Sequence, residues 1–228
     1  MDAIICENVV KEYSKIKAVD GISLSIKKGE IYGLIGRNGA GKTTLLKMMA
    51  GLVFPSSGEV VIENSGYEGR KTGLIIENPG LYKQATVINN LKILSPLAKA
   101  DKADIESILR TVDLWEYKGR KAAKLSQGMK QRLGIAMSLL GNPQILLLDE
   151  PFNGLDPEGI VLLRRIIHRV REKYGTTIIV SSHILEEIHK LVDRCGYVES
   201  GKLVAEFAGD VTTEDMEKLF KKEVEVLI

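Results

Sequence analysis

A short glycine-rich segment at residues 36–43 limits what this chain can fold into more than any other feature of the sequence. It reads Gly-Arg-Asn-Gly-Ala-Gly-Lys-Thr and matches the pattern G-x-x-x-x-G-K-[ST]. An apolar run at 31–35 precedes it, and a stretch rich in leucine and methionine at 43–50 follows it. A strand, a glycine loop and a helix in this order predict a phosphate-binding loop, or P-loop.

The P-loop also predicts which groups would hold a nucleotide. Its glycines let successive backbone N–H groups turn toward an anion, and the helix that starts near Lys42 adds the positive end of its dipole. Lys42 is expected to reach the β- and γ-phosphates, and Thr43 to offer its hydroxyl to Mg²⁺. The predicted nucleotide-binding residues of this segment are Gly36, Asn38, Gly39, Ala40, Gly41, Lys42, Thr43 and Thr44.

A second apolar run, at 145–148, ends in two adjacent carboxylates, Asp149 and Glu150. Two acids after a strand often only mark the start of a helix, but a P-loop upstream favours their interpretation as part of a nucleotide site. They would lie at the carboxyl edge of a parallel sheet, where ligands bind. We expect Asp149 to hold Mg²⁺, directly or through water, and Glu150 to orient or deprotonate the water that attacks the γ-phosphate.

Segments rich in β-branched residues alternate with helical patterns along most of the chain, which predicts an α/β fold: a P-loop NTPase core with a parallel sheet. The first 30 residues differ, because 3–10 and 22–26 resemble short strands with no helix pattern between them. They predict an antiparallel β-lobe at the N-terminus. Between about 85 and 140 the strand signals disappear, and 101–112 and 127–140 have apolar residues at helical spacing. This region is predicted to be an inserted helical sub-lobe.

The parallel sheet is expected to resume after the sub-lobe. We predict strands at 144–148 and 177–181, a helix at 157–173 that begins with a proline, and a short helix with a candidate edge strand at 213–228. The chain, residues 1–228, is therefore predicted to be a single domain. In it, 1–84 and 141–228 form the α/β core with its β-lobe, and 85–140 form the helical sub-lobe.

Composition and charge exclude several classes of protein. The chain has 228 residues, of which 44% are hydrophobic and 27% charged, so it is predicted to be globular. A net charge of +2 gives no broad basic surface, so no nucleic-acid partner is expected. No apolar run is long enough for a membrane span, and the N-terminus lacks a secretory pattern, so a cytoplasmic protein is expected. Cys6 and Cys195 have no metal-ligand spacing and are expected to be small buried side chains.

Residues 125–132, Leu-Ser-Gln-Gly-Met-Lys-Gln-Arg, resemble the signature motif of ATP-binding cassette (ABC) ATPases. Other elements of that family stand in the same order along essentially the whole chain. They are Tyr13 before the P-loop, the P-loop, the signature, the acidic strand, Gly154-Leu155-Asp156, and His183 after a strand.

The resemblance implies roles for these positions. Tyr13 would stack on adenine, and Asp156 would lie at the seam of a dimer. Ser126 and the Gly128 amide would touch the γ-phosphate bound on a second cassette, whereas His183 would contact the γ-phosphate of its own. The implied signature residues are Leu125, Ser126, Gln127, Gly128 and Met129, and the implied catalytic residues are Glu150 and His183.

This chain departs from the family pattern at three positions. Glu77 stands where many members have glutamine; a carboxylate can still ligate Mg²⁺, so the implied metal ligands are Thr43, Asp149 and Glu77. Gln127 replaces a more usual glycine, and Met129 replaces a glutamine. This combination resembles the branch of bacitracin- and lantibiotic-type peptide exporters and immunity systems.

The resemblance implies the ATPase subunit of an ABC transporter. Two copies, forming a homodimer, would close over two Mg·ATP, and transmembrane permease subunits would convert this movement into export of a peptide or drug. The subunit would lie on the cytoplasmic face of the membrane and meet the permease through residues 78–98. An alternative is a soluble cassette ATPase that acts on a macromolecular assembly, although such proteins usually have two cassettes or long coiled-coil inserts. A P-loop kinase or GTPase is a third class, but it would leave the signature unexplained.

Overall fold

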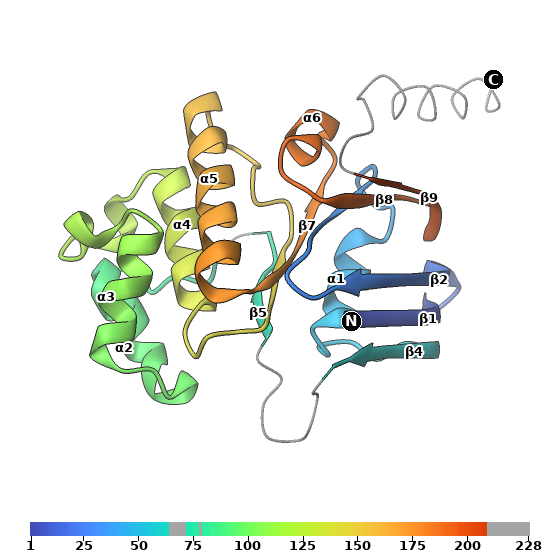
Figure 1. The fold of residues 1–228 in the computed structure, drawn as a ribbon, viewed down its shortest axis with the longest axis horizontal. Helices are drawn as coiled ribbons and strands as arrows, with labels where there is room; N and C mark the ends of the chain where they lie inside the picture. Colours follow the sequence, from blue (N-terminus) through green and yellow to red (C-terminus); the bar gives the residue numbers. More distant parts are fainter. Residues whose placement is uncertain (64–71, 78, 209–228) are drawn as a thin grey trace.

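The computed structural model describes residues 1–63, 72–77 and 79–208, and the strands within them form two sheets. Helices and strands alternate through much of this part of the chain, so the predicted α/β class is confirmed (Figure 1). The helix and edge strand predicted at 213–228 fall outside the described residues.

The larger sheet has six strands in the order β5-β6-β7-β3-β8-β9. Its parallel strands are β3 (Ile31–Ile35), β5 (Thr72–Ile75), β6 (Ile145–Leu148), β7 (Thr177–Ser182) and β8 (Arg194–Glu199), and β9 (Lys202–Ala208) is antiparallel to β8. Strands β3, β6 and β7 are buried along their whole length, as expected for a sheet covered on both faces. The β8–β9 hairpin was not among the predicted strands.

The N-terminal β-lobe is a three-stranded antiparallel sheet in the order β2-β1-β4. It consists of β1 (Asp2–Tyr13), β2 (Ile16–Lys27) and β4 (Ser57–Ile62). The antiparallel lobe was predicted, but β1 and β2 extend well beyond 3–10 and 22–26. Register shifts between Cys6 and Val9, and again between Lys11 and Glu12, accompany this extension, because a bulge lets pairing continue past an irregularity.

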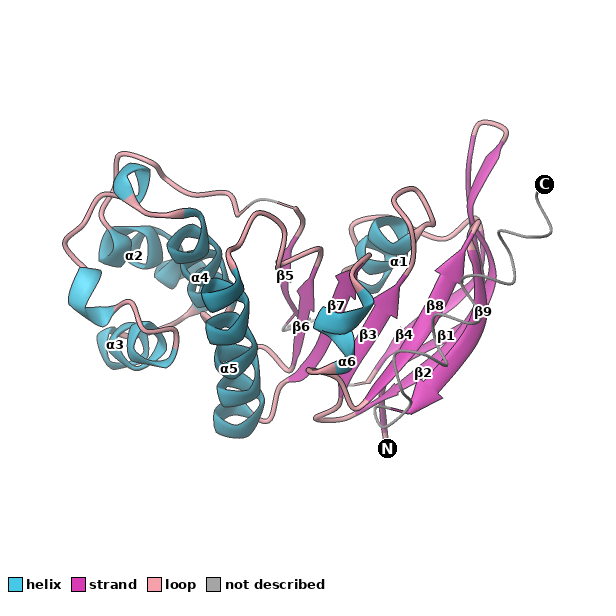
Figure 2. Ribbon diagram, turned by 90° about the horizontal axis from the view of Figure 1, so that it is seen from above, coloured by secondary structure: helices cyan, strands magenta, loops and turns pink. Residues whose placement is uncertain are grey.

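Most of the helices lie together on one side of the parallel sheet, away from the β-lobe (Figure 2). Between β5 and β6 the chain forms α2 (Val87–Ala98), α3 (Lys102–Thr111), the 3₁₀ turns η1 (Trp115–Tyr117) and η2 (Ala122–Lys124), and α4 (Gln127–Ser138). The other helices are α1 (Lys42–Met49), α5 (Pro157–Tyr174) and α6 (Leu185–His189). Helix α2 was not predicted as a separate element. No helix in the described part of the chain is long and apolar enough to cross a membrane.

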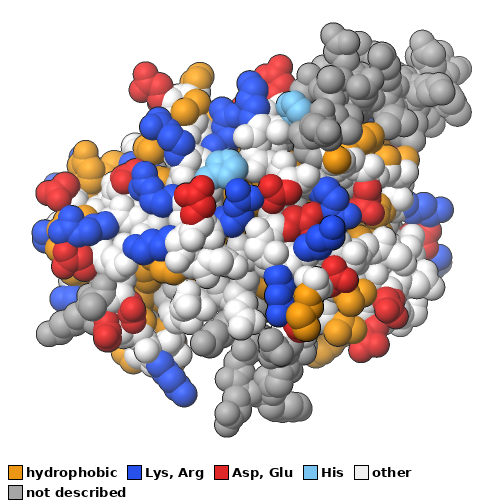
Figure 3. All heavy atoms as spheres, in the orientation of Figure 1, with side chains coloured by type: hydrophobic (Ala, Val, Ile, Leu, Met, Phe, Trp, Pro, Cys, Tyr) orange, Lys and Arg blue, Asp and Glu red, His pale blue; other side chains and the backbone are white. Residues whose placement is uncertain are grey.

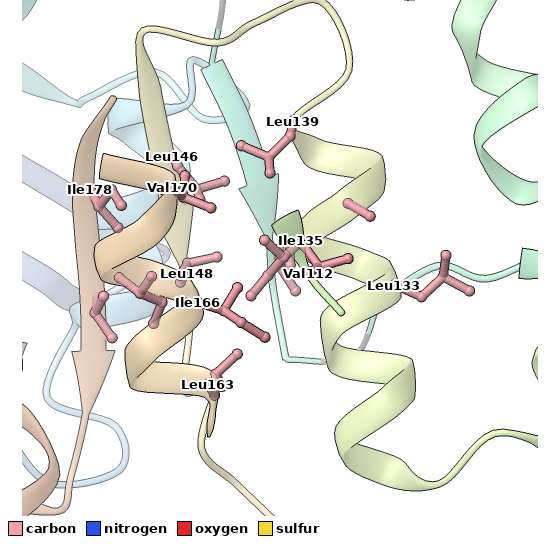
Figure 4. Packing of buried hydrophobic residues seen from close by; sticks show 14 of the residues in the cluster. Val112, Leu133, Ile135, Leu139, Leu146, Leu148, Leu163, Ile166, Val170 and Ile178 are labelled. Atoms are coloured by element: carbon pink, nitrogen blue, oxygen red, sulfur yellow. The ribbon is translucent and has the colours of Figure 1, made fainter. Parts of the chain in front are cut away.

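Buried side chains form two clusters, one on each face of the parallel sheet. Leu146, Leu148 and Ile178 face helices α4 and α5, where they join Ile135 and Ile166 (Figure 4). The residues between them on the strands, such as Leu147 and Ile179, belong to the cluster under α1 and the β-lobe. This alternation anchors β6 and β7 from both sides, so the residues that follow them start from a fixed backbone.

On the surface, acidic and basic side chains are interspersed on the face seen in Figure 3. Both cysteines are free and buried, as predicted. Burial raises the pKa of Cys6 to about 12 and that of Cys195 to about 11, so these thiols stay protonated and unreactive at neutral pH.

Candidate functional site

A cavity of about 510 Å³ opens at the carboxyl ends of β3 and β6. The sequence separately predicted a P-loop, an acidic pair and Glu77, and the structure brings all three to this cavity. The residues that line it are Ala18, Asn38, Gly39, Ala40, Gly41, Lys42, Thr43, Thr44, Glu77, Asp149, Glu150 and Asn153. We call it the P-loop cavity. Gly36 lies at the end of β3 and is not among the lining residues.

The backbone of the P-loop needs glycine at specific places. Gly39 has φ 84° and Gly41 has φ 108°, both in the left-handed region that other residues avoid. A side chain at Gly36 would collide with the carbonyl oxygen of Val198, and one at Gly41 with that of Ala18. The loop is therefore held against β8 and β2, which fixes its N–H groups at the start of α1.

Lys42 is the best-enclosed cation of the cavity, with only 5% of its side chain exposed. Its Nζ donates to the carbonyl oxygens of Gly36 at 2.6 Å and Arg37 at 3.2 Å, and lies 3.1 Å from Glu150 Oε1. The other oxygen of Glu150 is 2.8 Å from His183 Nδ1. The Glu150 carboxylate thus lies between the Lys42 ammonium and the His183 imidazole, and both of its oxygens have a partner.

Asp149 is fully buried, and both its oxygens have partners. The Thr43 hydroxyl donates to Oδ2 at 2.7 Å, and the Ser181 hydroxyl donates to Oδ1 at 2.5 Å. Because Thr43 gives its hydrogen to Asp149, its oxygen keeps its lone pairs for another ligand. Ser181 also accepts the backbone N–H of Glu150 at 2.9 Å. Ser181 was not among the predicted site residues; its place at the end of a predicted strand was the one available signal.

A second cavity, of about 260 Å³, brings most of the signature residues next to Asp156. We call it the signature cavity. Ser126 is the N-cap of α4 and accepts the Met129 N–H at 3.3 Å, and Asp156 is the N-cap of α5 and accepts the Gly159 N–H at 2.8 Å. The lining residues are Ser126, Gln127, Gly128, Met129, Arg132, Gly154, Leu155, Asp156, Gly159, Leu162 and Leu163. None of them lines the P-loop cavity.

Four predicted site residues line neither cavity: Tyr13, Gly36, Leu125 and His183. Tyr13 is at the end of β1, 46% exposed, with Lys11 Nζ 5.2 Å from its ring centre. Leu125 is 5% exposed and belongs to the core cluster between the helices and the sheet. Conversely, Ala18 and Asn153 line the P-loop cavity without having been predicted. Ala18 had no local signal, because only the folding of β2 over the P-loop brings it there.

Comparison with known proteins decides the family. The family described as ABC transporter matches residues 19–153, which run from β2 past the acidic pair. The chain belongs to the ABC transporter family. The chain is also 41% identical to the lantibiotic transport ATP-binding protein SrtF of Streptococcus pyogenes over 221 residues, covering 96% of both chains. It is 43% identical to the bacitracin transport ATP-binding protein BcrA of Bacillus licheniformis, covering 89% of this chain and 69% of the relative.

Solved ABC cassettes have the same fold. The cassette cbiO1 from Clostridium perfringens, part of the ABC transporter complex cbiONQ, superposes with a TM-score of 0.86 at 25% identity. That match covers 99% of this chain and 95% of the other. A dimeric cassette in a post-hydrolysis state bound to ADP and Pi superposes with a TM-score of 0.79 at 26% identity, covering 92% and 100%. This ABC protein is accordingly an ATP-binding subunit of a transporter and an ATPase.

Proposed function

We propose that two copies of this ABC subunit close head to tail over two Mg·ATP and so drive export of a peptide antibiotic through separate membrane subunits. One observation supports the dimer above all: the signature residues line a cavity that shares no residue with the P-loop cavity. The signature of one copy would then act on the nucleotide of the other. The solved dimeric cassette bound to ADP and Pi supports the same arrangement.

In the P-loop cavity we assign each group by its contacts. The backbone N–H groups of residues 38–44 and the Lys42 ammonium bind the phosphates, because they are the donors that line this space. Glu150 accepts a proton from the attacking water, and His183 holds the Glu150 carboxylate in place and contacts the γ-phosphate of its own cassette. Tyr13 stacks on adenine at the outer end of β1.

The side chains at this site also fit Mg²⁺. Magnesium prefers oxygen ligands and takes one or two carboxylates from the protein, with phosphate and water oxygens completing its shell. Thr43 and Asp149 offer a hydroxyl and a buried carboxylate within 2.7 Å of each other, and Glu77 lines the same cavity. No group of three or more acidic, histidine or cysteine side chains that could hold a metal occurs in the described residues, so the nucleotide would have to complete the site. Bound Mg²⁺ would neutralise charge on the β- and γ-phosphates.

At the dimer interface, Ser126 and the Gly128 amide contact the γ-phosphate on the partner copy. Ser126 is the N-cap of α4, and the first N–H groups of a helix have no partner within the helix, so they and the hydroxyl are placed to bind an anion together. Gln127 and Met129 complete the wall of the signature cavity, and Asp156 lies beside them at the seam.

The helical sub-lobe, which we keep as residues 85–140, carries our proposed permease surface. A groove of about 470 Å³ runs between β5 and helices α2 and α4, lined by apolar side chains that include Pro79, Leu94 and Met137. Leu97, on its rim, is 85% exposed. This groove lies within and beside the predicted 78–98 surface and would accept an apolar cytoplasmic segment of the membrane subunit. The ABC subunit would then lie on the cytoplasmic face of the membrane.

The named relatives support the proposed substrate class. Proteins named for lantibiotic and bacitracin transport are 41–44% identical to this chain over most of its length. Cells that lose this subunit are expected to become more sensitive to one of these peptides. Wild-type protein should restore resistance and the Glu150→Gln variant should not. Unchanged sensitivity to both peptides would reject the substrate class, and a chain that purifies from membranes without any membrane subunit would reject the proposed stable complex with a permease.

A further inference from the structure

The strand β7 places a buried hydroxyl between the two acidic residues of the site. Leu148, the last residue of β6, pairs with Val180 of β7, so the next residues along the two strands, Asp149 and Ser181, lie opposite each other. Ser181 is 0% exposed. Its hydroxyl donates to Asp149 Oδ1 at 2.5 Å and accepts the Glu150 N–H at 2.9 Å, so a single side chain contacts both acidic residues.

Glu150 has a backbone conformation that needs such a contact. Its φ is 48°, in the left-handed region that residues other than glycine adopt at a cost. This turn takes the chain off the strand direction and sends the Glu150 carboxylate toward Lys42 and His183. The hydrogen bond to Ser181 fixes the N–H of that strained residue.

Asp149 needs the same contact for a different reason. A buried carboxylate oxygen without a donor is costly, and an unheld carboxylate can rotate away from the direction in which it must offer its oxygens. Thr43 occupies Oδ2 and Ser181 occupies Oδ1, so the two hydroxyls fix the plane of the Asp149 carboxylate.

We propose that Ser181 is a positioning residue for ATP hydrolysis, which orients Asp149 as a metal ligand and holds Glu150 in the conformation that reaches the attacking water. This inference rests on the proposed roles of Asp149 and Glu150. Ser181 does not line the P-loop cavity and acts only through these two residues.

The neighbouring residue, Ser182, offers a matched control. It is also buried, at 1% exposure, but among the described residues its hydroxyl accepts the N–H of Ile184 and makes no hydrogen bond to either acid. Threonine and valine have nearly the same shape and both suit a strand, so they differ mainly in the hydroxyl. The informative variants of the full chain are therefore Ser181→Thr, Ser181→Val, Ser182→Thr and Ser182→Val.

We expect Ser181→Val to lower kcat about 10- to 100-fold, the usual effect of removing a group that orients a metal ligand, with KM for ATP within about twofold of wild type. Ser181→Thr should stay within about threefold of wild type, because it keeps the hydroxyl. In binding titrations with trinitrophenyl-ATP, Ser181→Val should also need more Mg²⁺ for half-saturation. This second readout requires no turnover. If the valine variant does not fold, Ser181→Ala removes the same hydroxyl without adding volume.

Thermal midpoints of the nucleotide-free proteins measure how far each variant loses stability. A fall in kcat without a matching fall in stability separates the positioning role from a structural one. If Ser181→Val and Ser182→Val lower kcat equally, or if Ser181→Thr is as slow as Ser181→Val, Ser181 contributes only to the fold. Unchanged kcat and unchanged Mg²⁺ dependence in Ser181→Val would also overturn the proposal. Failure of the proposed function looks different: Glu150→Gln would keep its activity while Ser181→Val still raised the Mg²⁺ requirement.

Discussion

The P-loop cavity and the signature cavity of this ABC subunit differ in how far one chain completes them. Around the P-loop cavity, Glu150 contacts Lys42 at 3.1 Å and His183 at 2.8 Å, and the hydroxyls of Thr43 and Ser181 donate to Asp149, although His183 and Ser181 are not lining residues. In the signature cavity, by contrast, the Ser126 hydroxyl and the Asp156 carboxylate accept, within the part of the chain that the structure describes, only N–H groups from the first turns of their own helices.

This difference has a physical reason. Charges in a buried site must be paired, so a chain that collects a lysine and several carboxylates at one sheet edge must arrange them against each other. A capped helix start is stable without a ligand and can still bind an anion that another molecule supplies. The first cavity is therefore expected to bind nucleotide in a single copy, and the second to act only after dimerisation.

Glu150→Gln is expected to have the largest effect and is the strongest test of the P-loop cavity. Glutamine keeps the shape but cannot accept the proton of water, so hydrolysis should fall about 10²- to 10⁴-fold. ATP binding should persist, because the phosphate-binding donors stay in place, and the ATP-bound dimer should become easier to isolate. Phosphate release and size-exclusion chromatography measure the two effects. Glu158→Gln, on the exposed start of α5, is the control and should behave as wild type. A Glu150→Gln protein that hydrolyses ATP at the wild-type rate would remove Glu150 from the mechanism.

Next in size, Lys42→Ala should weaken nucleotide binding about 10- to 100-fold, since it removes charge-assisted hydrogen bonds to the phosphates. It also leaves Glu150 without its ammonium partner, which adds repulsion toward an anionic ligand. Titration with a fluorescent ATP analogue measures the change. Lys47→Ala removes the same charge from the last turn of the same helix, outside the cavity, and should not affect binding. Equal affinities for the two variants would place the triphosphate elsewhere.

Ser126→Arg tests the signature cavity. The bulky side chain would fill the space that the partner's nucleotide needs, so ATP-dependent dimerisation should weaken by about tenfold or more. ATP binding by the single copy should remain near wild type, because Ser126 does not line the P-loop cavity. Sedimentation with and without ATP separates the two properties. Ser126→Thr keeps the helix cap and is the control. Loss of both properties together would mean that the signature serves its own site or only the fold.

The smallest effect is expected at Glu77, an exposed residue two positions after β5 that lines the P-loop cavity. Glu77→Gln keeps an oxygen ligand and removes a negative charge near the phosphates, so hydrolysis should equal or exceed the wild-type rate. Glu77→Ala offers no oxygen and should lower hydrolysis about two- to fivefold, most clearly at low Mg²⁺. Steady-state hydrolysis rates of the three proteins across Mg²⁺ concentrations test whether Glu77 contributes to the metal site. Identical curves would exclude Glu77 from the metal site.

Much of the P-loop cavity could be predicted because its parts are local. A glycine loop between an apolar strand and a helix fixes its own geometry, and Asp149 and Glu150 follow an apolar run that must be a buried strand. The starts of α4 and α5, which follow the N-caps Ser126 and Asp156, agree with the predicted 127 and 157, because a helix start depends on the residues around it. The roles of Ser126 and Asp156 in binding and dimerisation remain proposals.

Other features could not be read from the chain, because they depend on which segments become neighbours. The β8–β9 hairpin was missed, and only the fold of β2 brings Ala18 to the P-loop. The clearest case is Ser181, a small polar residue at the end of an apolar strand. By itself the sequence determined that an acidic pair follows one strand and a serine ends another. Only the pairing of β6 with β7, in the register that sets Leu148 beside Val180, decided that the serine hydroxyl meets both acids.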